Sequence, residues 1–103
     1  MSAQGARSLV DFQVGTLYLE IRIEHSRSLK DKRMVLRSLK DRLKRRHNVS
    51  VAEVAFHDSL RDAVVVVAAV AASRSGARRI LESAYEEAVQ ILDRSLYRAD
   101  LDV

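Results

Sequence analysis

Cysteine, proline and tryptophan are absent from this sequence of 103 residues, and it has only three glycines and five aromatic residues. Without cysteine the chain forms no disulfide, offers no thiolate nucleophile and builds no zinc site of the zinc-finger type. The longest apolar run, residues 63–72, is about half as long as the roughly 20 residues of a membrane-spanning helix. We therefore expect neither thiol chemistry nor a membrane span.

The residues that are present suit one small domain. Hydrophobic residues make up 48% of the chain and charged residues 31%, which is enough apolar material for a core and too much for intrinsic disorder. The opening residues lack the apolar segment of a secretory signal, so the expected location is the cytoplasm. We expect a flexible N-terminal arm over residues 1–11 and a single domain over residues 12–103.

Positive charge is concentrated in one segment. Residues 30–46 contain nine basic and two acidic residues, so this segment carries a charge of +7 while the whole chain carries +4. The other 86 residues therefore have a net charge of −3. An anionic partner would meet the basic segment first.

The spacing of apolar residues predicts six elements in the order β-α-β-β-α-β. A four-stranded antiparallel sheet with both helices on one face buries one face of each element, so we expect the α+β ferredoxin-like sandwich, with the first and third strands central. Ser28 is the expected N-cap of the first helix, and residues 73–76 offer a serine N-cap for the second. The elements are a strand at 17–24, a helix from 29 to about 47, strands at 49–56 and 63–72, a helix that follows residues 73–76 and runs to about 95, and a strand at 97–103.

Four single residues have specific predicted places. Gly15 lies where a bulge or bend is tolerated, and Asn48 is the expected C-cap of the first helix. Glu87 joins Glu82 and Glu86 in an acidic row on the outer face of the second helix. Tyr97 shares one face of the last strand with the alternate residues at 99, 101 and 103.

Two short motifs resemble a known family. The segments SRSLKDKR at 26–33 and NVSVAEV at 48–54 resemble the bacterial YlxP-like family, a domain of unknown function, and the resemblance extends over roughly residues 14–92. It implies a ferredoxin-like fold and supplies no catalytic residues. Genes for such proteins often lie among those for transcription elongation, translation initiation and ribosome maturation, which implies a role near RNA or the ribosome.

The first predicted helix carries a basic stripe at the spacing of one helix face, which suits contact with successive phosphates. A solvated face is the alternative, but two acidic residues are too few to pair with nine basic ones. The chain lacks the motifs of RNA-recognition and KH modules, so we expect contacts with the RNA backbone. The residues predicted to bind RNA or a ribonucleoprotein are Lys30, Lys32, Arg33, Arg37, Lys40 and Lys44.

Two other functions compete with RNA binding. Ser26, Ser28 and Lys30 form a candidate anion site for a small phosphorylated ligand at the start of the first helix. The sheet face away from the helices combines Tyr18 with valines and alanines of the third strand and is too apolar for ordinary surface. It invites a protein partner, so a homodimer through this face or an edge strand is the second alternative.

Catalytic and metal-binding patterns are weak. The residues His57, Asp58 and Asp62 fall close together, but their spacing matches no recognised metal or hydrolase motif. His25 has no evident partner that would orient it as a base, and His47 falls on the apolar side of the first helix. We therefore expect no enzyme activity, no metal and no cofactor.

Overall fold

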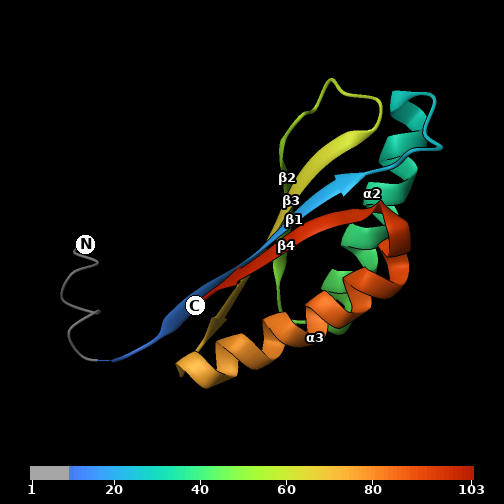
Figure 1. Cartoon of the computed structure of the whole chain (residues 1–103). Coiled ribbons are helices and arrows are strands. Elements are labelled where there is room, and N and C mark those ends of the chain that lie inside the picture. Colours follow the sequence, from blue (N-terminus) through green and yellow to red (C-terminus); the bar gives the residue numbers. More distant parts are fainter. Residues whose placement is uncertain (1–9) are drawn as a thin grey trace.

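Two long central strands organise the molecule, which we describe from a computed structural model covering residues 10–103 (Figure 1). The sheet order is β2-β3-β1-β4, and all neighbouring strands are antiparallel. This arrangement confirms the predicted ferredoxin-like fold and its central first and third strands. The elements are β1 (Gln13–Arg22), α2 (Leu29–Arg46), β2 (Ser50–Ala55), β3 (Asp62–Ala71), α3 (Arg74–Leu92), the short 3-10 helix η1 (Asp93–Ser95) and β4 (Leu96–Asp102).

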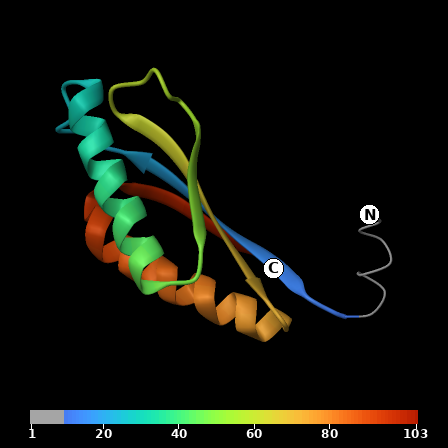
Figure 2. The same cartoon turned by 180° about the vertical axis from the view of Figure 1, so that it is seen from behind.

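The core lies between the sheet and the two helices, which cover the same face of the sheet (Figure 2). Alternate residues of β1 point toward the helices, so Leu17 and Leu19 are buried and lie opposite Val67 and Val65 of β3. The helices contribute side chains from their apolar stripes. These buried helical residues are Leu39 and Leu43 of α2 and Ala77, Leu81, Ala84, Ala88 and Leu92 of α3.

Both helices begin at serine caps, the first at the predicted Ser28 and the second at Ser73, within the predicted segment 73–76. The Ser28 hydroxyl accepts a hydrogen bond from the backbone N–H of Asp31 (3.1 Å), and the Asp31 carboxylate accepts one from the Arg27 N–H (3.0 Å). Ser73 likewise accepts from the Gly76 N–H (3.0 Å). The end of α2 differs from the prediction, because His47 and not Asn48 is the C-cap. Capping satisfies backbone groups that the first and last helical turns leave without partners.

Gly15 does not mark a bulge. The pairing of β1 with β3 runs without interruption from Gln13 to Arg22, and Gly15 takes one of the inward positions. A Cβ atom at this position would lie 2.8 Å from Leu81 Cδ1 and 2.7 Å from Val103 Cγ2. The missing side chain therefore lets α3 and the end of the chain approach β1, which corrects the prediction.

Because this space is filled, we expect Gly15→Ala to destabilise the domain by about 1–3 kcal/mol, the usual cost of overpacking a core. The midpoint of urea unfolding measures this loss, and the slope of the free energy of unfolding against urea concentration is expected to stay the same. Ser50→Ala on the exposed edge strand is the control and is expected to change stability by less than about 0.5 kcal/mol. An unchanged midpoint for Gly15→Ala would contradict the close packing.

A β-bulge removes Tyr97 from the strand face that it was predicted to share with residues 99, 101 and 103. In the β1–β4 ladder Glu20 pairs with Arg98, and the next pair is Ile21 with Leu96, so Tyr97 is the extra residue. Its side chain is 74% exposed, while Leu96 packs against the core in its place. The alternation of apolar residues along this strand predicted Tyr97 wrongly because a bulge reverses the alternation.

The predicted N-terminal arm, residues 1–11, lies almost wholly outside the described residues. Residues 10–12 precede β1 without regular secondary structure. Neither helix within the described part of the chain is both long enough and apolar enough to cross a membrane.

Candidate nucleic-acid interface

A groove of about 490 Å³ separates α2 from the edge strand β2, and basic side chains line it. Figure 2 shows α2 beside β2 on the helical side of the sheet. The floor is apolar and comes from Leu36, Val51 and Val65. The charged residues along the groove are Arg33, Arg37, Lys40, Lys44, Asp41 and Glu53. Four of the six residues predicted to bind RNA therefore share one groove.

The four basic residues of the groove form no ion pair with a carboxylate of residues 10–103. Among residues 10–103, ion pairs involve Arg22, Lys32, Arg42, Arg46, His47 and Arg98, and none involves Arg33, Arg37, Lys40 or Lys44. The same four side chains are exposed. Lys30, the fifth exposed residue of the prediction, lies near the start of the same helix and also lacks an ion pair in this part of the chain. Positive charge along this side of α2 is thus available to a ligand.

The other basic side of α2 is used within the chain. Glu87 of α3 lies 2.8 Å from His47 Nε2, 3.4 Å from Arg46 Nε and 3.9 Å from an Arg42 nitrogen. Its side chain is only 9% exposed, so Glu87 does not belong to a solvated acidic row as predicted. The reason is its place in α3, three residues after the buried Ala84, which turns it toward α2.

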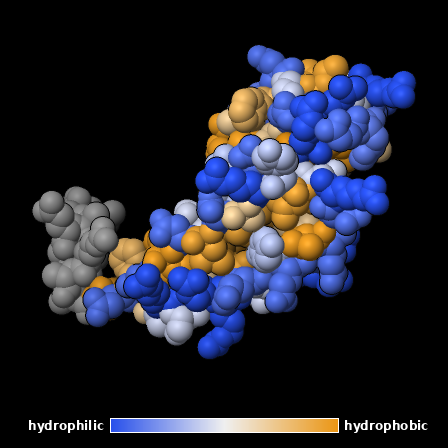
Figure 3. All heavy atoms as spheres, viewed as in Figure 1, coloured by the Kyte–Doolittle hydropathy of each residue, from blue (hydrophilic) through white to orange (hydrophobic). Residues whose placement is uncertain are grey.

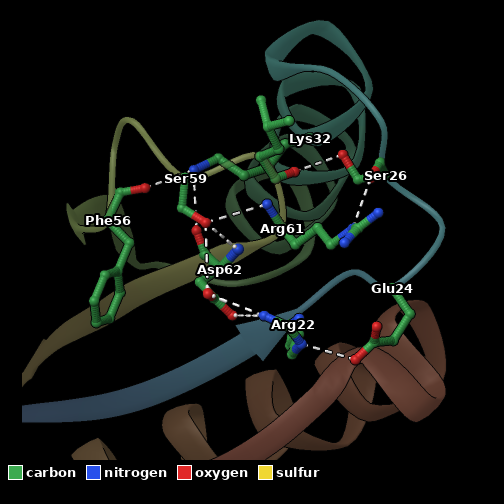
Figure 4. A network of polar contacts seen from close by, with 9 residues as sticks. Arg22, Glu24, Ser26, Lys32, Phe56, Ser59, Arg61 and Asp62 are labelled. Carbon is green, nitrogen blue, oxygen red and sulfur yellow. Dashed lines mark hydrogen bonds and ion pairs between the residues drawn. The ribbon is translucent and has the colours of Figure 1, made fainter.

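Lys32 is a structural residue and is not available at the groove surface. Its side chain is 1% exposed, and its ammonium donates to the carbonyls of Phe56 (2.8 Å) and Asp62 (3.0 Å). Glu53 Oε2 lies 3.2 Å from the same nitrogen. Figure 4 shows Lys32 reaching into the β2–β3 turn. The prediction that Lys32 contacts RNA with the exposed residues is corrected, because this lysine fastens α2 to the turn.

The predicted anion site is not assembled as an open site. Ser26 is fully buried, and its hydroxyl lies 2.6 Å from the Leu60 carbonyl, to which it donates (Figure 4). The backbone carbonyl of Ser26 accepts from Arg61 Nε (3.0 Å). The Ser28 hydroxyl is engaged as the cap of α2, next to the Asp31 carboxylate. Both hydroxyls are therefore used inside the chain, and of the three predicted residues only Lys30 faces solvent.

Ser26→Ala is therefore expected to lower stability by about 1–3 kcal/mol, because the buried Ser26 hydroxyl and its hydrogen bond to the Leu60 carbonyl are lost. Urea unfolding measures the effect. Ser38→Ala, on an exposed position of α2, is the matched control and is expected to be close to neutral. Equal stability of the two variants would show that the Ser26 hydroxyl is not a structural group.

The sheet face opposite the helices carries the apolar surface expected there, edged by paired charges. The register places Tyr18 beside Val66 and Arg22 beside Asp62. Arg22 forms ion pairs with Asp62 (2.9 Å) and Glu24 (2.8 Å). Its hydrogen bond to Asp62, and to a smaller extent the one to Glu24, raises the pKa of Arg22. Hydrophobic residues also interrupt the hydrophilic surface on the side where β4 lies (Figure 3). Apolar surface is thus present at both the open face and the β4 edge.

The histidine and carboxylate pattern does not gather into a metal site. Within residues 10–103 no group of three or more His, Cys, Asp or Glu side chains could hold a metal ion. His57 Nε2 lies 3.2 Å from the Glu53 carbonyl, and Asp62 pairs with Arg22. These side chains therefore serve local structure.

Comparison with solved structures shows the same fold at low sequence identity. The de novo designed protein Foldit4 is 15% identical, with a TM-score of 0.55, and the alignment covers 90% of this chain and 98% of the designed one. A C-terminal segment of the alpha subunit of aIF2 from Pyrococcus abyssi is 17% identical with a TM-score of 0.55, covering 95% of this chain and 53% of that one. The chain thus corresponds to about half of the archaeal structure. At these identities the likeness shows the fold alone.

Family comparison is more specific than the structural likeness. No curated protein matches the sequence. The profile of a family described as "Protein of unknown function (DUF503)" matches residues 14–97, which include both motifs and every element from β1 to the start of β4. The match covers most of the chain, and the protein therefore belongs to the DUF503 family.

Proposed function

We propose that this protein is a small, non-enzymatic cytoplasmic protein that binds RNA or a ribonucleoprotein surface through the groove between α2 and β2. The observation that carries the proposal is a row of four exposed cations along that groove, none of which forms an ion pair within residues 10–103: Arg33, Arg37, Lys40 and Lys44. The motifs at 26–33 and 48–54 further support a place among the bacterial YlxP-like members of the family, with a role near the ribosome.

The row has the length needed for several phosphate contacts. It extends from residue 33 to residue 44 of α2, or about 16 Å along the helix axis at a rise of about 1.5 Å per residue. The apolar floor of the groove lets the long stems of arginine and lysine lie along it while the charged ends stay at the rim. Arginine adds a planar guanidinium that binds phosphate with two hydrogen bonds. Such contacts hold a backbone without reading its sequence.

The groove favours backbone contacts over base stacking. None of its lining residues is aromatic, whereas modules that read single-stranded RNA stack bases on aromatic side chains. Asp41 and Glu53 line the groove as well, but Glu53 is already paired with Lys32. The remaining balance is positive, so the groove suits a folded RNA recognised by its shape and phosphates.

Salt dependence tests this proposal directly. The protein is titrated into fluorescently labelled, structured ribosomal RNA at about 50 and about 200 mM salt, and binding is followed by anisotropy. Four phosphate contacts predict that affinity falls roughly 50- to 150-fold between the two concentrations. Binding that is absent at the lower salt concentration, or that does not change with salt, would contradict the proposal.

A further inference from the structure

Three of the five aromatic residues lie on the sheet side that faces away from the helices: Tyr18, Phe56 and Tyr97. Phe56 is 56% exposed and Tyr97 is 74% exposed. These two rings line a hollow of about 340 Å³ together with Glu20, Arg22 and Asp62. The hollow lies at the turn end of the sheet and is separate from the basic groove, with which it shares no lining residue.

Each of the two aromatic residues lies at a backbone irregularity, Phe56 at a positive φ angle and Tyr97 at a β-bulge. Phe56 has a φ of 64°, in the left-handed region that side chains other than Gly, Asn and Asp rarely adopt. The ammonium of Lys32 holds its carbonyl at 2.8 Å, and in Figure 4 the Phe56 ring points away from that contact. Tyr97 faces outward because it is the extra residue of the β-bulge. The fold therefore fixes two exposed rings beside one hollow.

Within residues 10–103, Glu20 is the carboxylate of the hollow that forms no ion pair, although its charge acts on Arg98, its partner in the β1–β4 ladder. Arg22 is engaged by Asp62 and Glu24, and Arg98 by Asp100 at 2.8 Å. The hydrogen bond that Glu20 receives within residues 10–103 comes from the Tyr18 hydroxyl at 3.4 Å, which is long for an O–H donor. A carboxylate that forms no ion pair within residues 10–103, beside exposed aromatic rings, suits an organic cation.

The sheet face that points away from the helices carries a net negative charge. The strand register places six ionic residues on this face, four acids and two bases, so their net charge is −2: Glu20, Asp62, Asp100, Asp102, Arg22 and Arg98. A phosphate backbone would be repelled here, whereas it is attracted to the groove beside α2. The two surfaces therefore differ in the partner that their charge favours.

We propose that the hollow between Phe56 and Tyr97 binds the guanidinium group of an arginine side chain presented by a partner protein. The planar guanidinium stacks on the aromatic rings, and the Glu20 carboxylate accepts hydrogen bonds from its N–H groups. Arginine fits better than lysine because an ammonium cannot stack as a plane and is more strongly hydrated. The site adds a protein-binding surface to a chain whose other surface is basic.

The test uses the whole protein and N-acetyl-arginine amide as the probe, followed by amide shifts in two-dimensional NMR spectra. We expect saturable shifts at residues 20, 56, 63 and 97, with a dissociation constant in the millimolar range expected for a single side chain, about 1–10 mM. The neutral analogue N-acetyl-citrulline amide has the same shape and is expected to bind at least about tenfold more weakly, a difference of about 1.4 kcal/mol. Adenosine monophosphate serves as the probe for a base-stacking site.

Three variants separate the pocket from general effects of charge. Glu20→Gln is expected to lower arginine affinity about tenfold, while Glu86→Gln on the exposed side of α3 leaves it unchanged. Phe56→Gly removes one ring and keeps the fold, because glycine adopts a φ of 64° without strain. It is expected to abolish saturable shifts.

Several outcomes would overturn the proposal. They are equal binding of arginine and citrulline, stronger binding of adenosine monophosphate at the same residues, or no shifts at about 20 mM arginine. Retained arginine binding in both Glu20→Gln and Phe56→Gly would do the same. Self-association that covers these residues in the free protein would assign the face to a second copy instead.

Discussion

Replacing Arg33, Arg37 and Lys40 together by glutamate is expected to lower the affinity for structured RNA by about 100-fold or more at about 50 mM salt. Each substitution removes a cation that no carboxylate of residues 10–103 neutralises, and puts a negative charge beside the phosphates. All three side chains are exposed, so the variant keeps its core. Anisotropy titration of the labelled RNA measures the loss, and circular dichroism checks the fold.

The matched control reverses an equal number of charges elsewhere. Arg74, Arg78 and Arg79 are exposed in the first two turns of α3, so changing them to glutamate gives the same net charge as the groove variant. Negative charge near a helix N-terminus is also favourable. We expect this control to keep most of its RNA affinity. A loss as large as in the groove variant would mean that net charge, and not the groove, determines binding.

Lys32→Met is expected to have the largest effect on stability, about 3–5 kcal/mol, because it leaves a buried carboxylate oxygen and two carbonyls without their cation. For a domain of this size such a loss lowers the melting temperature by about 12 °C or more. Calorimetry or thermal circular dichroism measures the shift.

The neighbouring Lys30 is the control for Lys32. It lies two residues earlier on the same helix and is exposed, so Lys30→Met is expected to change stability by less than about 0.5 kcal/mol. If Lys32→Met melted at the same temperature as Lys30→Met, the ammonium would not be fastening the β2–β3 turn to α2.

Most of the fold could be predicted because its signals are local. Alternation along β1 reflects burial of one sheet face, the Val-Ala run marks β3 as a central strand, and a serine cap precedes each helix. The basic groove was predicted in part for the same reason. Residues 33, 37, 40 and 44 share a helix face by spacing alone, and that face lies along β2.

Two charged residues were misplaced because their partners come from distant parts of the chain. Lys32 stands four residues before Leu36 and seven before Leu39, so its spacing places it on the apolar stripe of α2. Glu87 has a comparable place beside the apolar stripe of α3. Their spacing was a usable signal. The carbonyls that accept from Lys32 belong to a turn whose position only the folded chain defines.

The hollow on the open face could not be found from the sequence. Nothing local announces the bulge that turns Tyr97 outward, since the apolar alternation of the last strand favours the opposite orientation. Position 56 is a phenylalanine, and not the glycine or asparagine that usually indicates a left-handed backbone. Its carbonyl accepts a hydrogen bond from Lys32 of α2, a contact that the sequence does not reveal. Both features depend on contacts between elements that are distant in the sequence, β1 with β4 for Tyr97 and α2 with the β2–β3 turn for Phe56.

The most direct test of the central claim is to map the RNA-binding surface on the folded protein. Amide shifts are recorded in two-dimensional NMR spectra as structured ribosomal RNA is added at about 50 mM salt, where phosphate contacts are strongest. The account predicts that the shifts concentrate at residues 33–44 of α2 and 50–55 of β2, and that the open sheet face is unaffected. Shifts centred on Tyr18, Glu20 and Val66 instead would contradict it.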